Sequence, residues 1–330
     1  MIQNDNMEMG GYLPLELNKG LEYFERFHDI DIWRFNSGRS SIVAALNSMK
    51  VRRVHIPFYN CYMVEEALKK NGYKIQKYKI DSNFLPQINR FEEDDWLVYI
   101  DYFGVCNKKV KELIAEKYKR VIFDNTQAFY AQPIIKEFVF NVYSCRKFFG
   151  VADGAYLVAK EGQKVITEYE EDSSWKRSSF LLRSIEEGTN NAYGDSLRSE
   201  EEIGFQVKLM SKLTRKIMQS VNYESVAMTR IRNFNCLNKL LCDINELNIS
   251  FEDEEVPMVY PLLIRNDNLR MELIKSKIYV PQWWKYLINE LDNEDYEVIL
   301  SKYLIPLPID QRYSEEQMTF LANTVKSHLV

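Results

Sequence analysis

The chain has 330 residues, of which 46% are hydrophobic and 28% charged, and its formal net charge is −5 at pH 7. This balance is typical of a globular protein with a large core, and the length suits two domains. The charge leaves no broad basic surface, which excludes nucleic acid as the main partner.

Short apolar runs alternate with helix-like stretches between residues 53 and 159. We expect strands at 54–57, 73–80, 96–101, 121–124, 137–143 and 155–159, and helices at 63–70 and 108–119. This alternation predicts an α/β fold whose sheet is mainly parallel and covered on both faces. Binding and catalytic residues collect at the carboxyl ends of the strands in such sheets.

The residues after 160 differ in charge and in predicted secondary structure. Residues 161–202 are charged and poor in strand signals, and we expect a mobile loop at 172–179. Residues 205–241 read as strongly helical. A strand at 256–264 and helices at 268–277 and 315–326 follow. We therefore predict a large domain over 1–220 and a smaller α+β domain over 221–330.

Cysteine and histidine usage indicates the compartment. Five cysteines form no CxxC pair, and three histidines stand far apart. We expect free thiols in a cytoplasmic protein without a metal site. Residues 1–9 are polar, and apolar runs such as 96–100 are too short to cross a bilayer, so we expect neither a signal peptide nor a membrane partner.

The first candidate site is the turn at 36–41, Asn-Ser-Gly-Arg-Ser-Ser, which precedes a helix-like run. The N-terminus of a helix presents free N–H groups and a positive dipole end, which suit a phosphate. Ser37 is equally explained as a simple N-cap, and taken alone that interpretation is the better one.

Two further motifs contain titratable groups. Asp124 ends an apolar strand within 123–127, Phe-Asp-Asn-Thr-Gln, and Lys147 lies between two strands ahead of a small-residue turn. A carboxylate can keep a cofactor ring nitrogen protonated, and a lysine near apolar neighbours can become a nucleophile. Each residue alone is more simply a helix cap or a solvated lysine.

The ordered set of motifs resembles the DegT/DnrJ/StrS family of sugar aminotransferases, which use pyridoxal 5'-phosphate (PLP). The resemblance rests on Ser37-Gly38-Arg39, on the run 57–61, on 123–127, and on Lys147 followed by Ala152-Asp153-Gly154. A further match is Leu307-Pro308 followed by 314–316. The resemblance implies the fold-type-I architecture, with a mainly parallel seven-stranded sheet and a smaller C-terminal domain.

The resemblance also implies roles for single residues. Lys147 is the Schiff-base lysine and proton carrier, and Asp124 pairs with the pyridine nitrogen. Gln127 lies near the phenolic oxygen of the cofactor. The other cofactor-binding residues are Ser37, Gly38, Arg39 and Ser144 at the phosphate and Tyr59 or Tyr62 as the stacking ring. The implied reaction moves an amino group from glutamate to a keto-sugar nucleotide in a homodimer.

Some positions depart from the family pattern and keep alternatives open. Val142 stands where the family has a phosphate-binding serine, and the family's Asn-Tyr-Arg-Met segment has only 188–191 as a weak counterpart. The alternatives are a scaffold that lost catalysis and a PLP enzyme with a non-sugar acceptor. Trp283 and Trp284 could line a pocket, but paired tryptophans at the start of a helix are more often one core residue and one interface residue, which is the preferred interpretation.

Overall fold

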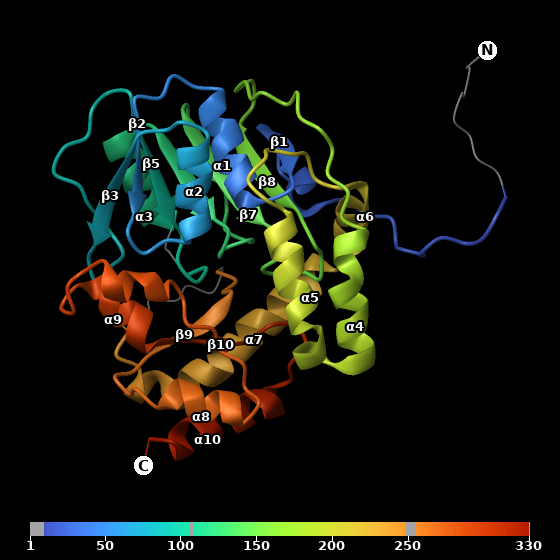
Figure 1. Ribbon diagram of the computed structural model, residues 1–330, viewed down its shortest axis with the longest axis vertical. Helices are drawn as coiled ribbons and strands as arrows, with labels where there is room; N and C mark the ends of the chain where they lie inside the picture. Colours follow the sequence, from blue (N-terminus) through green and yellow to red (C-terminus); the bar gives the residue numbers. More distant parts are fainter. Residues whose placement is uncertain (1–9, 106–107, 248–254, 330) are drawn as a thin grey trace.

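The computed structural model describes residues 10–105, 108–247 and 255–329. Its centre is a sheet of eight strands in the order β1-β8-β7-β6-β5-β2-β3-β4 (Figure 1). The strands are β1 (Ile30–Phe35), β2 (Arg53–Pro57), β3 (Ile75–Ile80), β4 (Pro86–Gln87), β5 (Asp95–Ile100), β6 (Val121–Asn125), β7 (Val139–Ser144) and β8 (Ala155–Lys160).

The predicted mainly parallel α/β sheet is confirmed, with one strand more than the seven expected. Strands β3, β2, β5, β6 and β7 pair in parallel, while β8, β1 and β4 pair antiparallel with their neighbours. The eighth strand is the two-residue edge strand β4, which is too short to leave a period in the sequence. The expected strands at 54–57 and 121–124 match β2 and β6 closely.

Helices cover both faces of this sheet, as buried parallel strands require. Helices α1 (Gly38–Asn47) and α2 (Tyr62–Lys70) pack on one face, against side chains that include Trp96, Val98 and Ile122. Helix α3 (Lys108–Tyr118) packs on the other, against Leu97, Tyr99 and Phe123. Strands β5, β6 and β7 are buried along their whole length, so their carboxyl ends open onto protein rather than solvent.

The expected helix over 205–241 is divided in two. Helix α6 (Lys212–Ser220) begins where the Ser211 side chain accepts the Thr214 N–H, and α7 (Tyr223–Leu241) begins where Asn222 caps Ser225. Both are N-caps, which fix helix starts inside an otherwise helical pattern. Residues 205–211 precede α6 in extended or irregular form.

The C-terminal part forms a second layer below the large sheet in Figure 1. Its two-stranded antiparallel sheet packs with helices around a core that contains Phe234, Leu262 and Leu321. The elements are β9 (Val259–Leu263), α8 (Leu269–Lys275), α9 (Tyr296–Tyr303), β10 (Leu304–Pro308) and α10 (Glu315–Ser327). The domain boundary near Ser220 stays a prediction.

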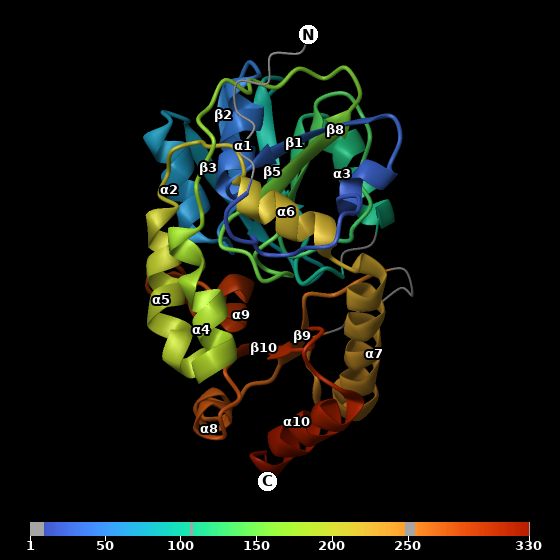
Figure 2. The same cartoon turned by 90° about the vertical axis from the view of Figure 1, so that its right-hand side faces the viewer.

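Residues 161–202 contain a helical hairpin that the sequence did not indicate. Helices α4 (Ser179–Glu187) and α5 (Thr189–Glu202) lie side by side and apart from the large sheet (Figures 1 and 2). No residue of α4 is buried, and only Ala192 and Ser199 of α5 are. Helix α4 does carry apolar residues at helical spacing, Leu181, Leu182 and Ile185, but none of them is buried in the single chain.

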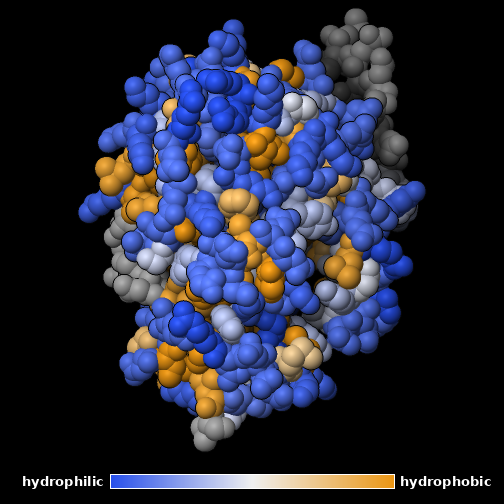
Figure 3. Space-filling model, turned by 60° about the vertical axis from the view of Figure 1, so that its left-hand side comes forward, coloured by the Kyte–Doolittle hydropathy of each residue, from blue (hydrophilic) through white to orange (hydrophobic). Residues whose placement is uncertain are grey.

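The surface is dominated by polar residues. On the face drawn in Figure 3, hydrophobic side chains form small separate groups among hydrophilic ones. Within the described ranges, no helix is both long and apolar enough to cross a membrane.

Candidate active site

A cavity of about 420 Å³ opens at the carboxyl ends of β5, β6 and β7, beside the N-terminus of α1. Eight of the nine predicted site residues line it, namely Ser37, Gly38, Arg39, Tyr62, Asp124, Gln127, Ser144 and Lys147. The volume falls in the range typical of small-molecule sites. The fold thus brings together residues that lie up to 110 positions apart in the chain, from Ser37 to Lys147.

Lys147 lies in the turn that follows β7, and its side chain is exposed to the cavity. Its Nζ donates a hydrogen bond to Thr126 Oγ1 at 3.0 Å. The protein around the cavity desolvates the ammonium and lowers the pKa of Lys147, and the Asp124 charge opposes this with a smaller effect. A lowered pKa increases the share of neutral amine, which is the nucleophilic form.

Backbone hydrogen bonds fix the turn that contains Lys147. The Cys145 N–H donates to the Gly154 carbonyl at 3.0 Å, and the Gly154 N–H donates to the Asn36 carbonyl at 2.7 Å. Gly154 has φ +111°, and a Cβ there would lie 2.7 Å from Thr214 Cγ2. Only glycine satisfies both the left-handed backbone and this close approach.

Asp124 and Gln127 present polar groups from the end of β6. The Thr126 N–H donates to Asp124 Oδ1 at 3.0 Å, while the other oxygen of this buried carboxylate accepts no hydrogen bond from a described residue. Gln127 Oε1 accepts the Phe103 N–H at 2.9 Å. Because an N–H must bind the amide oxygen, the Gln127 Nε2 group is left as the free donor.

The N-terminus of α1 forms another wall. The Ser37 side chain caps the helix by accepting the Ser40 N–H, and the Ser41 N–H donates to the Ser37 carbonyl at 3.0 Å. The N–H groups of Gly38 and Arg39 are then the ones without a partner inside the helix, as the first turn requires. A Cβ at Gly38 would lie 2.7 Å from Thr126 Cγ2, so glycine allows this close approach.

Ser37 is therefore an N-cap, in agreement with its simplest interpretation. The free backbone donors are the N–H groups of the two residues that follow it. The Arg39 side chain binds other parts of the protein. Its Nε donates to the Gly204 carbonyl at 2.8 Å and its Nη1 to Glu200 Oε1 at 3.1 Å. The Arg39 Nη2 group is buried without a hydrogen-bond partner, and the backbone N–H of Arg39 remains for an anion at this turn.

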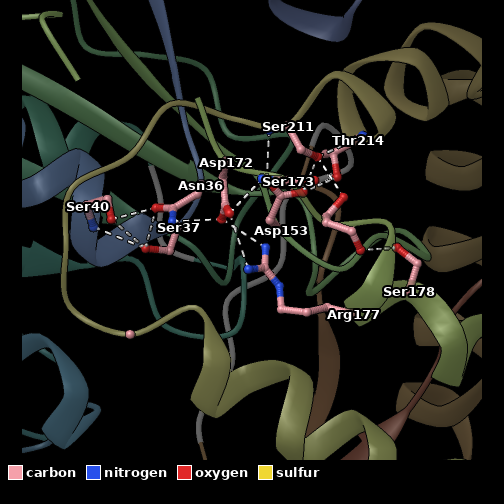
Figure 4. A network of polar contacts seen from close by, with 12 residues as sticks. Asn36, Ser37, Ser40, Asp153, Asp172, Ser173, Arg177, Ser178, Ser211 and Thr214 are labelled. Atoms are coloured by element: carbon pink, nitrogen blue, oxygen red, sulfur yellow. Dashed lines mark hydrogen bonds and ion pairs between the residues drawn. The ribbon is translucent and has the colours of Figure 1, made fainter. Parts of the chain in front are cut away.

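A buried polar network stands behind this turn (Figure 4). Asn36 Oδ1 accepts the Ser40 hydroxyl at 2.7 Å, and Asn36 Nδ2 donates to Asp172 Oδ2 at 3.0 Å. Arg177 Nη2 donates to the same oxygen of Asp172 at 2.8 Å. The segment expected to be a mobile loop is thus anchored, because Asp172 lies buried between an amide and a guanidinium.

The second half of the network joins the lysine turn to α6. Buried Asp153 accepts the N–H of Ser211 at 2.8 Å, its hydroxyl at 2.8 Å, and the hydroxyl of Thr214 (Figure 4). These three donors occupy both oxygens of the buried carboxylate. The Asp153-Gly154 pair, found by resemblance alone, therefore fixes the backbone that follows Lys147.

The aromatic wall differs from the prediction. Tyr59 does not line the cavity, because its ring is fully buried and lies edge-on against Trp284 with centroids 4.2 Å apart. Trp284 lines the cavity instead, while Trp283 stacks on Phe103 in the core. Tyr62 does line the cavity. Both tryptophans pack against the core, and Trp284 also has the pocket-lining position that was the alternative to one core and one interface residue.

An ion-pair cluster at the cavity rim was missed from the sequence. Glu200 of α5 pairs with Arg39 and with Arg146, the residue before Lys147. Burial alone would raise the pKa of Glu200, but Arg146 and then Arg39 outweigh it and lower that pKa to about 2. Nothing distinguishes Glu200 from Glu201 and Glu202 in the sequence, so only the fold selects it.

The other departures from the family pattern can now be placed. Val142 is buried inside β7 and packs in the sheet core, whereas Ser144 at the strand end lines the cavity. Residues 188–191 lie at the bend between α4 and α5, and only Thr189 among them lines a cavity, a different one. No group of three or more His, Cys, Asp or Glu in the described ranges could hold a metal ion.

No family model matches the sequence, and no curated protein does. Solved structures match it in fold. DesV from S. venezuelae is 13% identical with a TM-score of 0.62, over 90% of this chain and 84% of that one. A DegT DnrJ EryC1 StrS aminotransferase from Brucella abortus is 13% identical with a TM-score of 0.61, over 92% and 87%. The sugar aminotransferase CalS13 from Micromonospora echinospora is 14% identical with a TM-score of 0.59, over 90% and 87%.

The chain has the aminotransferase fold. This confirms the predicted fold-type-I architecture, because the match extends over nine tenths of the chain and so includes both the large sheet and the C-terminal layer. At 13 to 14% identity the likeness concerns the fold, and the chemistry has to be argued from the cavity itself.

Proposed function

We propose that this chain is a PLP-dependent aminotransferase that transfers an amino group from glutamate to a keto-sugar nucleotide. One observation carries the proposal. In a fold shared with sugar aminotransferases, the Lys147 amine, the Asp124 carboxylate and the open N-terminus of α1 face a single cavity. A nucleophilic amine, a buried carboxylate and an anion site are the three groups that PLP needs from a protein.

The residues present fit the cofactor. Asp124 has one carboxylate oxygen unused by described residues, which suits a protonated ring nitrogen. The Gly38 and Arg39 N–H groups and Ser144 would hold the phosphate, and the Gln127 Nε2 group would donate to the phenolic oxygen. Spr1654 from Streptococcus pneumoniae, described as a sugar aminotransferase and solved in its PLP form, has the same fold at 13% identity.

When bound, PLP supplies an electron sink that makes the proton on the donor's α-carbon removable. Lys147 would hold the cofactor through its Nζ, and the same amine would take that proton and return it at a different atom. Its lowered pKa favours the neutral amine that both tasks would require. Asp124 would keep the ring nitrogen charged, and Thr126 Oγ1, 3.0 Å from the amine, orients Lys147 toward the cavity.

The finer parts of the proposal rest on the family resemblance. It supports glutamate as donor, a nucleotide sugar as acceptor, surface-polysaccharide or deoxysugar synthesis as the setting, and a homodimer. The exposed Leu182, Ile185 and Tyr193 on the α4–α5 hairpin suit association with a second copy. The cysteines that the structure describes are free thiols, which suits the cytoplasm.

Two observations favour a second candidate, a scaffold without catalysis. Val142 replaces the family's phosphate serine with a buried apolar side chain, and the Arg39 guanidinium is bound to Glu200 rather than free for phosphate. An enzyme with another acceptor shares all the features of the first proposal and differs only in substrate.

The test is the visible absorption spectrum of the protein after incubation with PLP and removal of excess cofactor. We expect a band in the wild type that Lys147→Ala loses and that Lys160→Ala, at an exposed lysine ending β8, retains. Glutamate should change the band, and a keto-sugar nucleotide should restore it. No retained band in the wild type would favour the scaffold, and a glutamate response without turnover of keto-sugar nucleotides would favour another acceptor.

A further inference from the structure

A second cavity of about 570 Å³ lies on the other side of Lys147. Its walls are the loop 146–152, the α4–α5 hairpin, Arg230 of α7, and the loop 310–312 of the C-terminal layer. It shares Arg146, Lys147 and Glu200 with the first cavity. The two cavities therefore meet at the lysine turn, one beside the N-terminus of α1 and the other beside the α4–α5 hairpin.

Arg230 is the unusual residue in this cavity, since it is only 2% exposed and has no carboxylate partner among the described residues. Its Nη1 donates to the Met258 carbonyl at 2.9 Å, and its guanidinium lies 4.5 Å from the centroid of the Phe148 ring. Its Nε is enclosed without a hydrogen-bond partner. Neutral carbonyls and a ring face surround the guanidinium, so Arg230 has no direct ion pair among the described residues.

The Asp310 carboxylate forms no direct ion pair with Arg230, because its oxygens bind Arg312. Asp310 accepts two hydrogen bonds from Arg312, at 2.7 and 2.9 Å from Nε and Nη2. Apart from Lys147, whose lowered pKa favours the neutral amine, the cavity wall thus contains the three arginines Arg146, Arg230 and Arg312 against the acids Glu200 and Asp310. This local excess of positive charge contrasts with a chain whose net charge is −5.

The same walls offer apolar surface. Phe148, Phe180 and Tyr193 line the cavity together with hydroxyl groups that include Ser184 and Ser196. A volume of about 570 Å³ exceeds what an amino acid fills and suits a ligand with a ring as well as a charged group. Buried charges are normally paired, and the partner that Arg230 lacks inside the chain can be supplied by such a ligand.

We infer that this second cavity binds the negatively charged part of the substrate of Lys147, an oxyanion of phosphate or carboxylate type that faces Arg230. The inference rests on the proposed function, because it assigns the ligand to the amine that both cavities share. A phosphate oxyanion belongs to the sugar nucleotide, and a carboxylate belongs to the amino donor. The apolar part of the ligand lies against Phe180 and Tyr193 of the hairpin side.

The test is isothermal titration calorimetry of the full chain with thymidine diphosphate and, separately, with glutarate, before and after loading with PLP. We expect one of the two probes to bind the wild type. Arg230→Gln, which keeps a donor for the Met258 carbonyl, should weaken that binding by at least about tenfold. Arg230→Lys should lie between the two. Arg232→Gln makes the same charge change on the exposed side of α7 and should bind within about twofold of the wild type.

A second variant avoids any dependence on the folding of the Arg230 variants. Ser184 lines the cavity from α4 and is only half-buried, so Ser184→Trp fills the cavity without disturbing the core, and it should abolish binding of the same probe. Thymidine diphosphate as the responsive probe identifies the phosphate oxyanion, and glutarate identifies the carboxylate.

The inference is overturned if neither probe binds the wild type, or if Ser184→Trp or a folded Arg230→Gln binds as tightly as the wild type. The cofactor band separates this result from failure of the proposed function. A normal band without probe binding overturns the inference alone. Probe binding that depends on Arg230 in a protein without a band supports the anion site and rejects the aminotransferase.

Discussion

Two walls of very different construction meet at Lys147. On the sheet side Asp124, Gln127 and Ser144 are buried and lie at the ends of strands that are themselves buried on both faces. On the hairpin side no residue of α4 is buried, and Leu182 and Ile185 are 68% and 81% exposed. The first wall is fixed by packing from several elements, whereas the second is attached largely through Glu200 and its two arginines.

This difference separates two tasks. Groups that move protons must be held within fractions of an ångström, so they belong on the wall that packing determines. A wall with few buried contacts can change sequence at little cost in stability, so it suits the selection of a particular acceptor. Substitutions on the two walls should therefore differ in kind, and the following ones probe that division in order of expected effect.

Asp124→Asn should have the largest effect and should act on turnover rather than folding. The amide keeps the shape of the side chain but cannot hold a proton on a ring nitrogen, so we expect turnover to fall by at least about a hundredfold. Single-turnover amino transfer in the cofactor-loaded protein measures this. Asp124→Glu, which keeps the charge, should retain more activity than the amide. Equal activity in Asp124→Asn and the wild type would exclude the proposed role.

Asp153→Ala should have the largest effect on stability. It removes a fully buried carboxylate and leaves the Ser211 N–H and two hydroxyls without their acceptor. We expect a loss of roughly 3 kcal/mol in the free energy of unfolding. Urea denaturation measures it, with Asp267→Ala at an exposed aspartate as the control. A loss no larger than that of the control would mean that the lysine turn is held by its backbone alone.

The sheet wall was largely predictable from the sequence, and the reason is physical. Strands that are buried on both faces are continuous apolar runs, so the parallel strand at 121–124 and the antiparallel strand at 155–159 were found with their boundaries nearly right. Asp124 and Lys147 followed from the order of motifs around those strands. Tyr59 was misplaced because spacing alone does not say whether a ring faces the cavity or lies under another ring, here that of Trp284.

The hairpin wall could not be predicted in the same way. Its helices bury almost nothing, and the short apolar stripe of α4, Leu181, Leu182 and Ile185, lies within a segment that is otherwise charged and polar. Glu200 and Arg230 are chosen by contacts with residues far along the chain, such as Arg39 and Phe148. The edge strand β4 was also missed because it has only two residues, whereas β1 was missed although Ile30, Ile32 and Phe35 give it an apolar pattern.

Glu200→Gln should have a moderate effect that depends on pH. The folded-state pKa of about 2 lies below the ordinary value of 4.5, so the carboxylate stabilises the fold above about pH 4.5. That contribution is lost as the pH falls from 4.5 toward 2. Because the Glu200 side chain is 39% exposed, we expect only about 1 kcal/mol at pH 7 after solvent screening.

The melting temperatures of Glu200→Gln and the wild type should therefore differ by about 2 °C at pH 7 and converge in acid. Glu202→Gln, on the same helix but exposed and without an ion pair in the described ranges, serves as the control and should show no such convergence. A difference between Glu200→Gln and the wild type that stays constant down to pH 3 would mean that the ion pairs are not what attaches the hairpin.

Ile185→Ser should have the smallest effect, and it tests the comparison most directly when paired with Ile100→Ser. Ile100 is buried at the end of β5 on the sheet wall, and the loss of its apolar side chain should cost about 2 to 4 kcal/mol in unfolding free energy. Ile185 is mostly in solvent, and its replacement should stay within about 0.5 kcal/mol. Urea denaturation at low protein concentration compares the free energies of unfolding of the two variants.

Sedimentation at high protein concentration then tests whether a second copy covers Ile185. If it does, Ile185→Ser weakens association while the isolated chain keeps its stability. A cost at Ile185 equal to that at Ile100 would contradict the division between a packed wall and an open one.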